Sequence, residues 1–342
     1  MRIFKRLLLF LAVNLLIACA MNFVLTDPSI VRIYLEDIEQ NDYDTLIIGT
    51  SHGETGFDPF LMSEGLDAKV FNASRRLMPV PDLYYLLKTA NAGGSLKTVY
   101  YELDPTYWNA VMQIKTHDDT CMLRHASIPD RIEYAAKYLM GENYNYTLFP
   151  YNFDMKTLKK APGIVRSKVL LSDLPPDERI RGIYSFLNIS KNFDYIGRGF
   201  RAGREKDPLA DETFEPLFFA PENIAPEYHD AFSDMVRYCR EEAIRLVCVV
   251  SALPEKRLVE ENYPAAHEYF RRLCDENGVE FFDMNALRPG LLPRTPEDYT
   301  DLDGHMMGEL ARRQTQLLIE LEKARDREAF FVNDLSAALT TL

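Results

Sequence analysis

Two short polar segments, far apart in the chain, carry residue types that could do nucleophilic chemistry. Ser51 lies in the segment 49–53 (GTSHG), directly after an apolar run, and this segment matches the pattern G-x-S-x-G. Near the other end of the chain, Asp301 and Asp303 precede His305. A serine hydroxyl is a weak nucleophile at neutral pH, so it needs a base, and that base needs an acceptor to orient it. Together the two segments contain the residue types of a serine esterase or acyltransferase.

The segment 49–53 also allows two other interpretations. One is a phosphate-binding turn, but the chain has neither G-x-x-x-x-G-K-[ST] nor G-x-G-x-x-G at this place. The other is a polar turn without chemistry, which this segment alone does not exclude. The α/β-hydrolase elbow is disfavoured because it normally lies deep in its domain, whereas residues 49–53 follow the first strand after the N-terminal apolar segment.

His305 is the expected base because two aspartates precede it at alternate positions, just ahead of a predicted helix. His52 is next to Ser51, but a neighbour on a tight turn usually points elsewhere, so we interpret it as structural. Asp303 is the preferred partner of His305, since a two-residue separation can turn a carboxylate back toward the ring in a loop. Asp301 is the alternative partner, and an Asp just before a helix also suits a capping role. The chain has six histidines: His52, His117, His125, His229, His267 and His305.

The elements that must position these residues alternate along the chain. Short apolar, β-branched or aromatic runs predict five strands, and helical patterns separate most of them. This alternation predicts an α/β fold with a parallel five-stranded, flavodoxin-like sheet of order 2-1-3-4-5. Ser51 then lies just past the carboxyl end of a central strand, where open α/β sheets bind ligands. The predicted strands are 45–49, 69–72, 98–103, 246–250 and 279–282.

A serine after the first strand and an Asp/His cluster before the last helix resemble the SGNH (GDSL-type) hydrolases. The resemblance covers about residues 44–322 and is greatest to the membrane-anchored, cell-envelope branch, which includes the teichoic-acid D-alanylation protein DltD and the alginate O-acetylation proteins. It implies an acyl-Ser51 intermediate with His305 as base, and no cofactor or metal. The usual acid position, three residues before the histidine, is Leu302 here, whereas Asp303 gives the D-x-H spacing of the alginate branch.

The resemblance also suggests where an oxyanion would bind. The block after the second strand is 72–75 (NASR), so Asn72, Ser74 and Arg75 are the candidate oxyanion- or substrate-binding residues. The family's glycine is absent from this block, and residues 102–105 (ELDP) replace the family's G-x-N-D. A carboxylate near a developing oxyanion is unfavourable. These departures suit a slow transferase or a degenerate, non-catalytic site.

The N-terminus carries a membrane signal. Basic residues precede an apolar run over 7–25, long enough to span the hydrocarbon core, and acidic residues dominate after it. This predicts a single-pass anchor over 1–26 with the rest of the chain extracytoplasmic. The alternative is a cleaved signal peptide with its apolar region over 7–17, or lipidation at Cys19, which follows a lipobox-like Leu-Ile-Ala.

The remaining chain is expected to form one SGNH-like domain over 27–324 and a tail over 325–342. That domain contains a long insertion at about 105–225, which suits a lid or substrate platform. Within it, residues 198–204 (RGFRAGR) form a basic loop that is either solvated or able to bind phosphate or carboxylate. The five cysteines have no metal-site spacing, and Cys121 could form an extracytoplasmic disulfide.

These features favour a membrane-tethered extracytoplasmic serine esterase or O-acyltransferase. Its substrate would be a cell-envelope polysaccharide or a teichoic-acid-like polymer, and a membrane-bound acyltransferase is an expected partner. A net charge of −13 argues against nucleic acid as a partner. The alternative is a non-catalytic envelope-assembly or polymer-binding factor with a degenerate site.

Overall fold

The computed structural model describes residues 2–109, 125–138, 155–187 and 191–339. The chain forms two compact units, one made of residues 1–33 and 114–190 and the other of residues 34–113 and 191–342. The proposed active-site residues all lie in the second unit. The predicted insertion is described only in part, and Cys121 and His117 lie outside the described residues.

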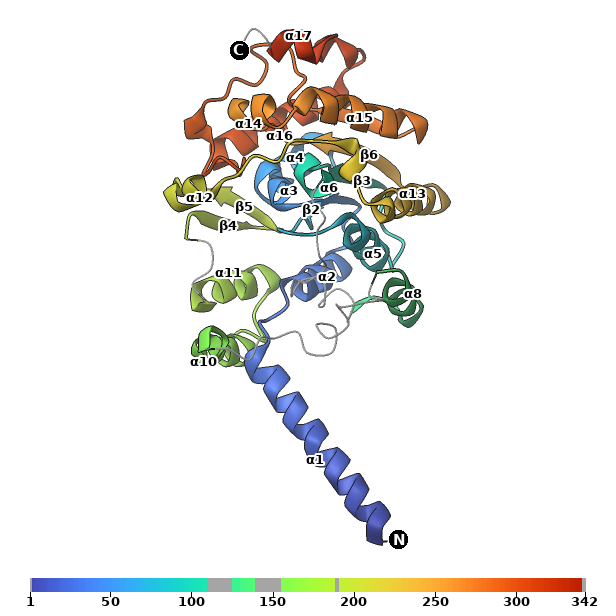
Figure 1. Ribbon diagram of the computed structural model, residues 1–342, viewed down its shortest axis with the longest axis vertical. Helices are drawn as coiled ribbons and strands as arrows, with labels where there is room; N and C mark the ends of the chain where they lie inside the picture. The colour runs from blue at the N-terminus through green and yellow to red at the C-terminus, as the bar shows by residue number, and fades with distance from the viewer. Residues whose placement is uncertain (1, 110–124, 139–154, 188–190, 340–342) are drawn as a thin grey trace. The chain divides into compact units, whose positions relative to one another are not determined.

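A five-stranded sheet forms the centre of the second unit (Figure 1). Its order is β2-β1-β3-β6-β7 and every neighbouring pair is parallel, which confirms the predicted α/β fold and strand order. β1 is an inner strand between β2 and β3, with Leu46 opposite both Phe71 and Val99. Both faces of the sheet are covered, so its strands read as continuous apolar runs. The strands are β1 (Thr45–Ile48), β2 (Val70–Asn72), β3 (Thr98–Glu102), β6 (Arg245–Val250) and β7 (Glu280–Asp283).

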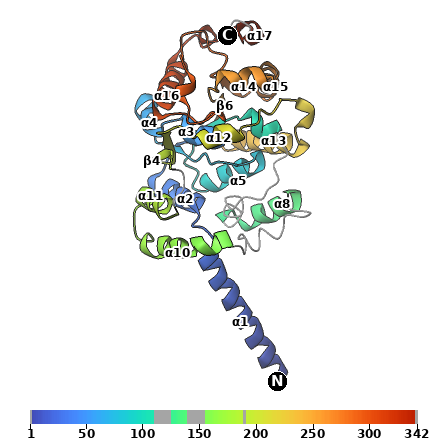
Figure 2. The ribbon, with the colours of Figure 1, turned by 60° about the vertical axis from the view of Figure 1, so that its left-hand side comes forward.

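The helices form layers on the sheet. Helices α3, α4 and α16 pack against one another, and side chains of α4 and α16 form one apolar core with β1, β6 and β7. Figure 2 shows α4 and α16 side by side. Helices α5 and α13 form a second contacting pair. The bounds of these helices are α3 (Ser51–Gly56), α4 (Pro59–Leu66), α5 (Val80–Ala90), α13 (Pro226–Glu241) and α16 (Gly308–Lys323).

Shorter elements complete the second unit. An antiparallel hairpin, β4 (Phe193–Gly197) with β5 (Phe200–Gly203), occupies the segment predicted to be a basic loop. That prediction is wrong in its structure, because residues 198 and 199 alone form the turn and both have positive φ. The other elements are α2 (Ile30–Asn41, which begins in the first unit), α6 (Pro105–Asn109), α12 (Pro208–Thr213), α14 (Glu255–Glu260), α15 (Tyr263–Glu276) and α17 (Leu335–Leu339), with 3-10 turns at Pro221–Asn223, Pro296–Asp298 and Glu328–Phe330.

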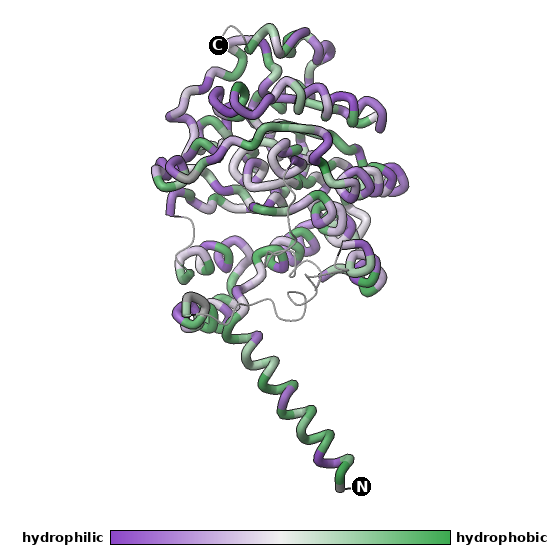
Figure 3. The backbone as a smooth tube through the Cα atoms, viewed as in Figure 1, coloured by the Kyte–Doolittle hydropathy of each residue, from purple (hydrophilic) through white to green (hydrophobic). Residues whose placement is uncertain are grey.

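The first unit contains a long apolar helix. Residues Ile3–Leu25 of α1 (Arg2–Leu25) are long and apolar enough to cross a membrane, and none of the most apolar stretch is buried. Figure 3 shows hydrophobic colour along most of this helix. The coarse prediction of an apolar N-terminal helix is therefore confirmed. The other described helices of this unit are α8 (Ile128–Tyr138), α10 (Met155–Leu170) and α11 (Pro176–Leu187).

Candidate active site

Ser51 is the first residue of α3, three residues beyond the end of β1. Thr50 is the helix N-cap, and its hydroxyl accepts a hydrogen bond from the His52 N–H at 3.3 Å. Further along, Asp58 caps α4 by accepting from the Phe60 and Leu61 N–H groups, with Pro59 at the first helical position. Two successive caps thus fix the turn that carries Ser51.

The two glycines that flank Ser51 are needed for close packing. A Cβ at Gly49 would lie 2.6 Å from the Glu102 Cβ, and a Cβ at Gly53 would lie 2.5 Å from the Ser74 Oγ. Both distances are shorter than a carbon side chain tolerates. The two glycines of the G-x-S-x-G pattern are therefore explained by the close packing of this turn on the ends of β2 and β3.

His305 is oriented by Asp301. The Asp301 Oδ2 lies 2.8 Å from His305 Nδ1, while its Oδ1 accepts from the Gly304 and His305 N–H groups at 3.1 and 3.2 Å. Although burial opposes the shift, the hydrogen bond and charge of His305 lower the pKa of Asp301 to about 2. Gly304 allows this turn because its φ is +105°. His305 thus has the position of a base, and Asp301 is the carboxylate that orients its ring.

The structure places Asp301, and not the preferred Asp303, at His305 Nδ1. Asp303 lies on the other side of the ring, with its Oδ2 3.9 Å from His305 Nε2, and its side chain is 43% exposed. Arg257 holds it from the opposite direction, 3.4 Å from Oδ1. Asp301 does not cap the last helix either, since α16 starts at Gly308 and its N-cap makes no side-chain hydrogen bond.

His52 is buried and joined on both sides. Its Nδ1 lies 3.0 Å from the Asp104 Oδ2, and its Nε2 lies 2.8 Å from the Asp303 carbonyl oxygen. Burial opposes protonation, but the Asp104 carboxylate outweighs it and raises the pKa of His52 to about 10. A ring held as an imidazolium cannot accept a proton from a nucleophile. This supports the interpretation of His52 as structural, linking α3 to the His305 loop.

Two carboxylates at the end of β3 lie beneath the Ser51 turn. Glu102 accepts from the Thr50 N–H and hydroxyl, both at 3.2 Å, and Asp104 lies 2.9 Å from the same hydroxyl. Burial and the neighbouring Asp104 charge raise the pKa of Glu102 to about 7. Both side chains contact Thr50 and so stabilise the turn that carries Ser51. The signal for them in the sequence was their position at the carboxyl end of a parallel strand.

The residues predicted to bind an oxyanion hold the turn instead. The Asn72 side-chain amide donates to the Gly53 and Phe57 carbonyl oxygens at 2.8 and 3.0 Å, and its Oδ1 accepts from the Ser74 N–H. The Arg75 N–H donates to the Gly49 carbonyl, and its guanidinium pairs with Glu54 at 2.7 Å. The Ser74 hydroxyl is buried and unpartnered within the described residues. The block after β2 therefore has a structural role in this geometry.

Glu54 is the centre of a buried ion-pair network that the sequence did not reveal. Its second oxygen pairs with Arg201 of β5 at 2.9 Å, and no part of the Glu54 side chain is exposed. The Arg201 guanidinium also lies over the Phe193 ring, 4.6 Å from its centroid, and that ring packs edge-on against His305. The hairpin thus supports both the Ser51 helix and the His305 ring.

The two halves of the proposed site lie close together. The His52 and His305 ring centroids are 5.4 Å apart, which places the His305 loop against α3. Burial, with the charges of Asp104 and Asp303, raises the pKa of the Tyr107 phenol, which forms a hydrogen bond with Ser51. Ser51 is only 6% exposed, and the described hydrogen bonds include none between its hydroxyl and His305.

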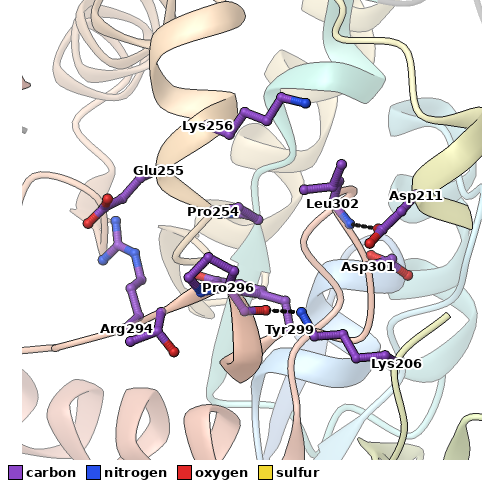
Figure 4. Close-up of a pocket in the computed structure, with 11 residues that line it drawn as sticks. Lys206, Asp211, Pro254, Glu255, Lys256, Arg294, Pro296, Tyr299, Asp301 and Leu302 are labelled. Carbon is purple, nitrogen blue, oxygen red and sulfur yellow. Dashed lines mark hydrogen bonds between the residues drawn. The ribbon is translucent and has the colours of Figure 1, made fainter. Parts of the chain in front are cut away.

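A pocket adjoins the Asp301 side of the loop. Its volume is about 180 Å³, and Tyr299, Asp301 and Leu302 form part of its wall (Figure 4). Asp211 of α12 closes that wall by accepting from the Leu302 N–H at 2.6 Å, and Lys206 donates to the Pro296 carbonyl. The rest of the lining is Pro254, Glu255, Lys256, Arg294 and Thr295.

One group of side chains has the composition of a metal site. Ligand atoms of His52, Asp303 and His305 lie within 4.8 Å of one another. Both ring nitrogens of His52 already face oxygen atoms, and its Nε2 must carry a proton to bond the Asp303 carbonyl oxygen, which can only accept. These residues therefore do not fit a cation.

Comparison with known proteins gives no independent identification of this site. No family model matches the chain, and no curated protein is significantly similar to it. The function must therefore be argued from the geometry of the residues.

Proposed function

We propose that this chain is a membrane-tethered, extracytoplasmic serine esterase or O-acyltransferase. The observation that carries the proposal is the 2.8 Å pair between His305 and Asp301, held against the helix that begins at Ser51. A histidine whose Nδ1 is held by a carboxylate, packed against a serine-bearing turn, has the residue types needed to activate a hydroxyl.

The reaction would have two halves. In the first, His305 Nε2 takes the proton of the Ser51 hydroxyl as its oxygen attacks the ester carbonyl, and the protonated ring then gives the proton to the departing alkoxide. In the second, an acceptor hydroxyl or water loses its proton to His305 and attacks acyl-Ser51; the bond to Ser51 breaks, and the protonated ring returns that proton to the serine oxygen. Asp301 holds the Nδ1–H throughout and stabilises the imidazolium. Catalytic hydrogen bonds are often longer without substrate, so a Ser51 hydroxyl that is not hydrogen-bonded to His305 among the described residues is compatible with this mechanism.

The substrate class rests on the resemblance to cell-envelope SGNH hydrolases. An acyl ester on a cell-envelope polysaccharide or teichoic-acid-like polymer is accessible to an enzyme tethered outside the membrane by α1. The basic residues before α1 and the acidic residues after it support this orientation. A membrane-bound acyltransferase would supply the acyl group if the reaction runs as transfer.

Active-site labelling tests the proposal. A fluorophosphonate probe should react with the full-length protein in detergent and modify Ser51, as located by peptide mass mapping. Ser51→Ala should remove the labelling, whereas Ser172→Ala, at an exposed serine, should leave it unchanged. Labelling that persists in Ser51→Ala would exclude this serine as the nucleophile.

The second candidate is a non-catalytic factor that binds the envelope polymer. It is favoured by one observation: the donors after β2 that would stabilise an oxyanion are used to hold α3. In that case the parent protein would not react with the probe, and Ser51→Ala would bind the polymer as well as the parent does.

A further inference from the structure

Helix α10 differs from the rest of this acidic chain. The chain has a net charge of −13, yet every charged residue of α10 is Lys or Arg. The helix has sixteen residues, and both α10 and α1 belong to the first compact unit. Such a local reversal of charge indicates a surface that meets an anionic partner.

One side of α10 is buried and the other is open. Ile164 and Ser167 are buried, and Gly163 lies where a Cβ would be 3.1 Å from the Phe186 carbonyl of α11. The open side recurs at helical spacing and combines apolar with basic side chains. This outward face consists of Met155, Leu158, Lys159, Pro162, Arg166, Val169 and Leu170.

The apolar members of the outward face are large and well exposed. Met155, Val169 and Leu170 are 67%, 57% and 58% exposed. An amphipathic helix with exposed aliphatic side chains and Lys or Arg beside them is the composition of a helix that lies in a lipid interface. The long stems of the basic residues let their charges reach the headgroups while the aliphatic parts stay near the acyl chains.

A direct contact ties α10 to the end of α1. Lys168 Nζ donates to the Phe23 and Thr26 carbonyl oxygens at 2.8 and 2.5 Å and lies over the Phe23 ring. The last carbonyls of a helix have no partner within it, and a cation there also interacts favourably with the negative end of the helix dipole. Figures 1 and 2 show α10 lying across the C-terminal end of α1. A helix across the end of a membrane span lies in the plane of the membrane surface.

We propose that the outward face of α10 lies on the membrane that α1 crosses and binds anionic lipid headgroups. This inference rests on the proposed membrane anchor but not on any catalytic activity. Lys159 and Arg166 would contact lipid phosphates, and Met155, Val169 and Leu170 would enter the boundary between headgroups and acyl chains. The bound α10 would fix how the first unit meets the bilayer, which the single span alone leaves free to rotate.

Tryptophan quenching by brominated lipids tests the location. The parent has a single tryptophan, Trp108, which is 1% exposed in the second unit and provides a low background. In full-length protein reconstituted in vesicles, Val169→Trp should lose emission when the acyl chains carry bromine. Val259→Trp is the matched control, because Val259 is 66% exposed but lies beside Glu260 and Glu261.

Lipid charge tests the partner. Quenching of Val169→Trp should be greater in phosphatidylglycerol vesicles than in phosphatidylcholine vesicles, and the double change Lys159→Glu and Arg166→Glu should remove that difference. Quenching no greater than in Val259→Trp would overturn the proposal. Equal quenching in the two vesicle types would contradict the proposed contact with anionic headgroups. Leu15→Trp in α1 should be quenched in both vesicle types, and its failure would overturn the anchor and the proposal together.

Discussion

Two polar networks lie near Ser51, and their charged side chains differ in solvent exposure. The network under α3 joins His52 to Asp104 and Glu54 to two arginines, with side chains from 0% to 7% exposed. The network of the His305 loop is more open: the His305 side chain is 19% exposed and that of Asp303 is 43% exposed. The first network is closed to solvent and the second is not.

This difference assigns different roles to the two histidines. A buried charge that is fully paired resists a change of protonation, because losing its partner leaves the other charge without compensation. His52 is in that situation, and its raised pKa keeps it charged. His305 has Nδ1 on Asp301, and its Nε2 lies 3.9 Å from the partly exposed Asp303 carboxylate. We therefore infer that the buried network positions the turn that carries Ser51. In the open loop, His305 would accept and donate the proton in the reaction.

The largest expected effect comes from separating the two aspartates of the open loop. Asp301→Asn should lower kcat for a chromogenic acetyl ester by up to ~10⁴-fold, because an amide favours the wrong histidine tautomer. Asp303→Asn should retain most of the activity, since Asp303 does not contact Nδ1. Initial rates on both purified variants test this. The reverse ranking would mean that Asp303, not Asp301, orients the base.

Next in size is the loss of the buried charge at Glu54. Glu54→Gln leaves Arg75 and Arg201 without their shared partner, so the free energy of unfolding should fall by about 3–5 kcal/mol. Glu268→Gln, at an exposed pair with Arg271, should change it by less than about 1 kcal/mol. Urea denaturation of the parent and of each variant measures these two changes in the free energy of unfolding. Equal small effects would show that the Glu54 network does not hold the turn.

A pH series tests the buried histidine with a smaller effect. The pKa of His52 is raised from 6.5 to about 10 in the folded protein, so its contribution to stability is complete below pH 6.5. That contribution should be lost progressively as the pH rises from 6.5 to about 10. Urea midpoints should therefore decline over this window in the parent, and the decline should be shallower in His52→Gln. The same slope in both proteins would show that His52 is not held as a cation.

The sequence was sufficient for the sheet but only in part for the site. Short β-branched and aromatic runs predicted β1 and its neighbours, because local periodicity decides where such strands form. The side of His305 that each aspartate reaches depends on Gly304 at φ +105°, which spacing alone does not show. Arg201 reaches Glu54 across 147 positions, and no local pattern predicts such a contact.

The central claim is that Ser51 carries an acyl group during the reaction. Full-length protein would be mixed with a chromogenic acetyl ester, quenched in acid after a short time, and analysed by intact and peptide mass spectrometry. The account predicts a mass increase of one acetyl group on the peptide that contains Ser51, absent in Ser51→Ala and strongly reduced in His305→Ala. Acetylation that is absent from the parent, or found equally in His305→Ala, would contradict it.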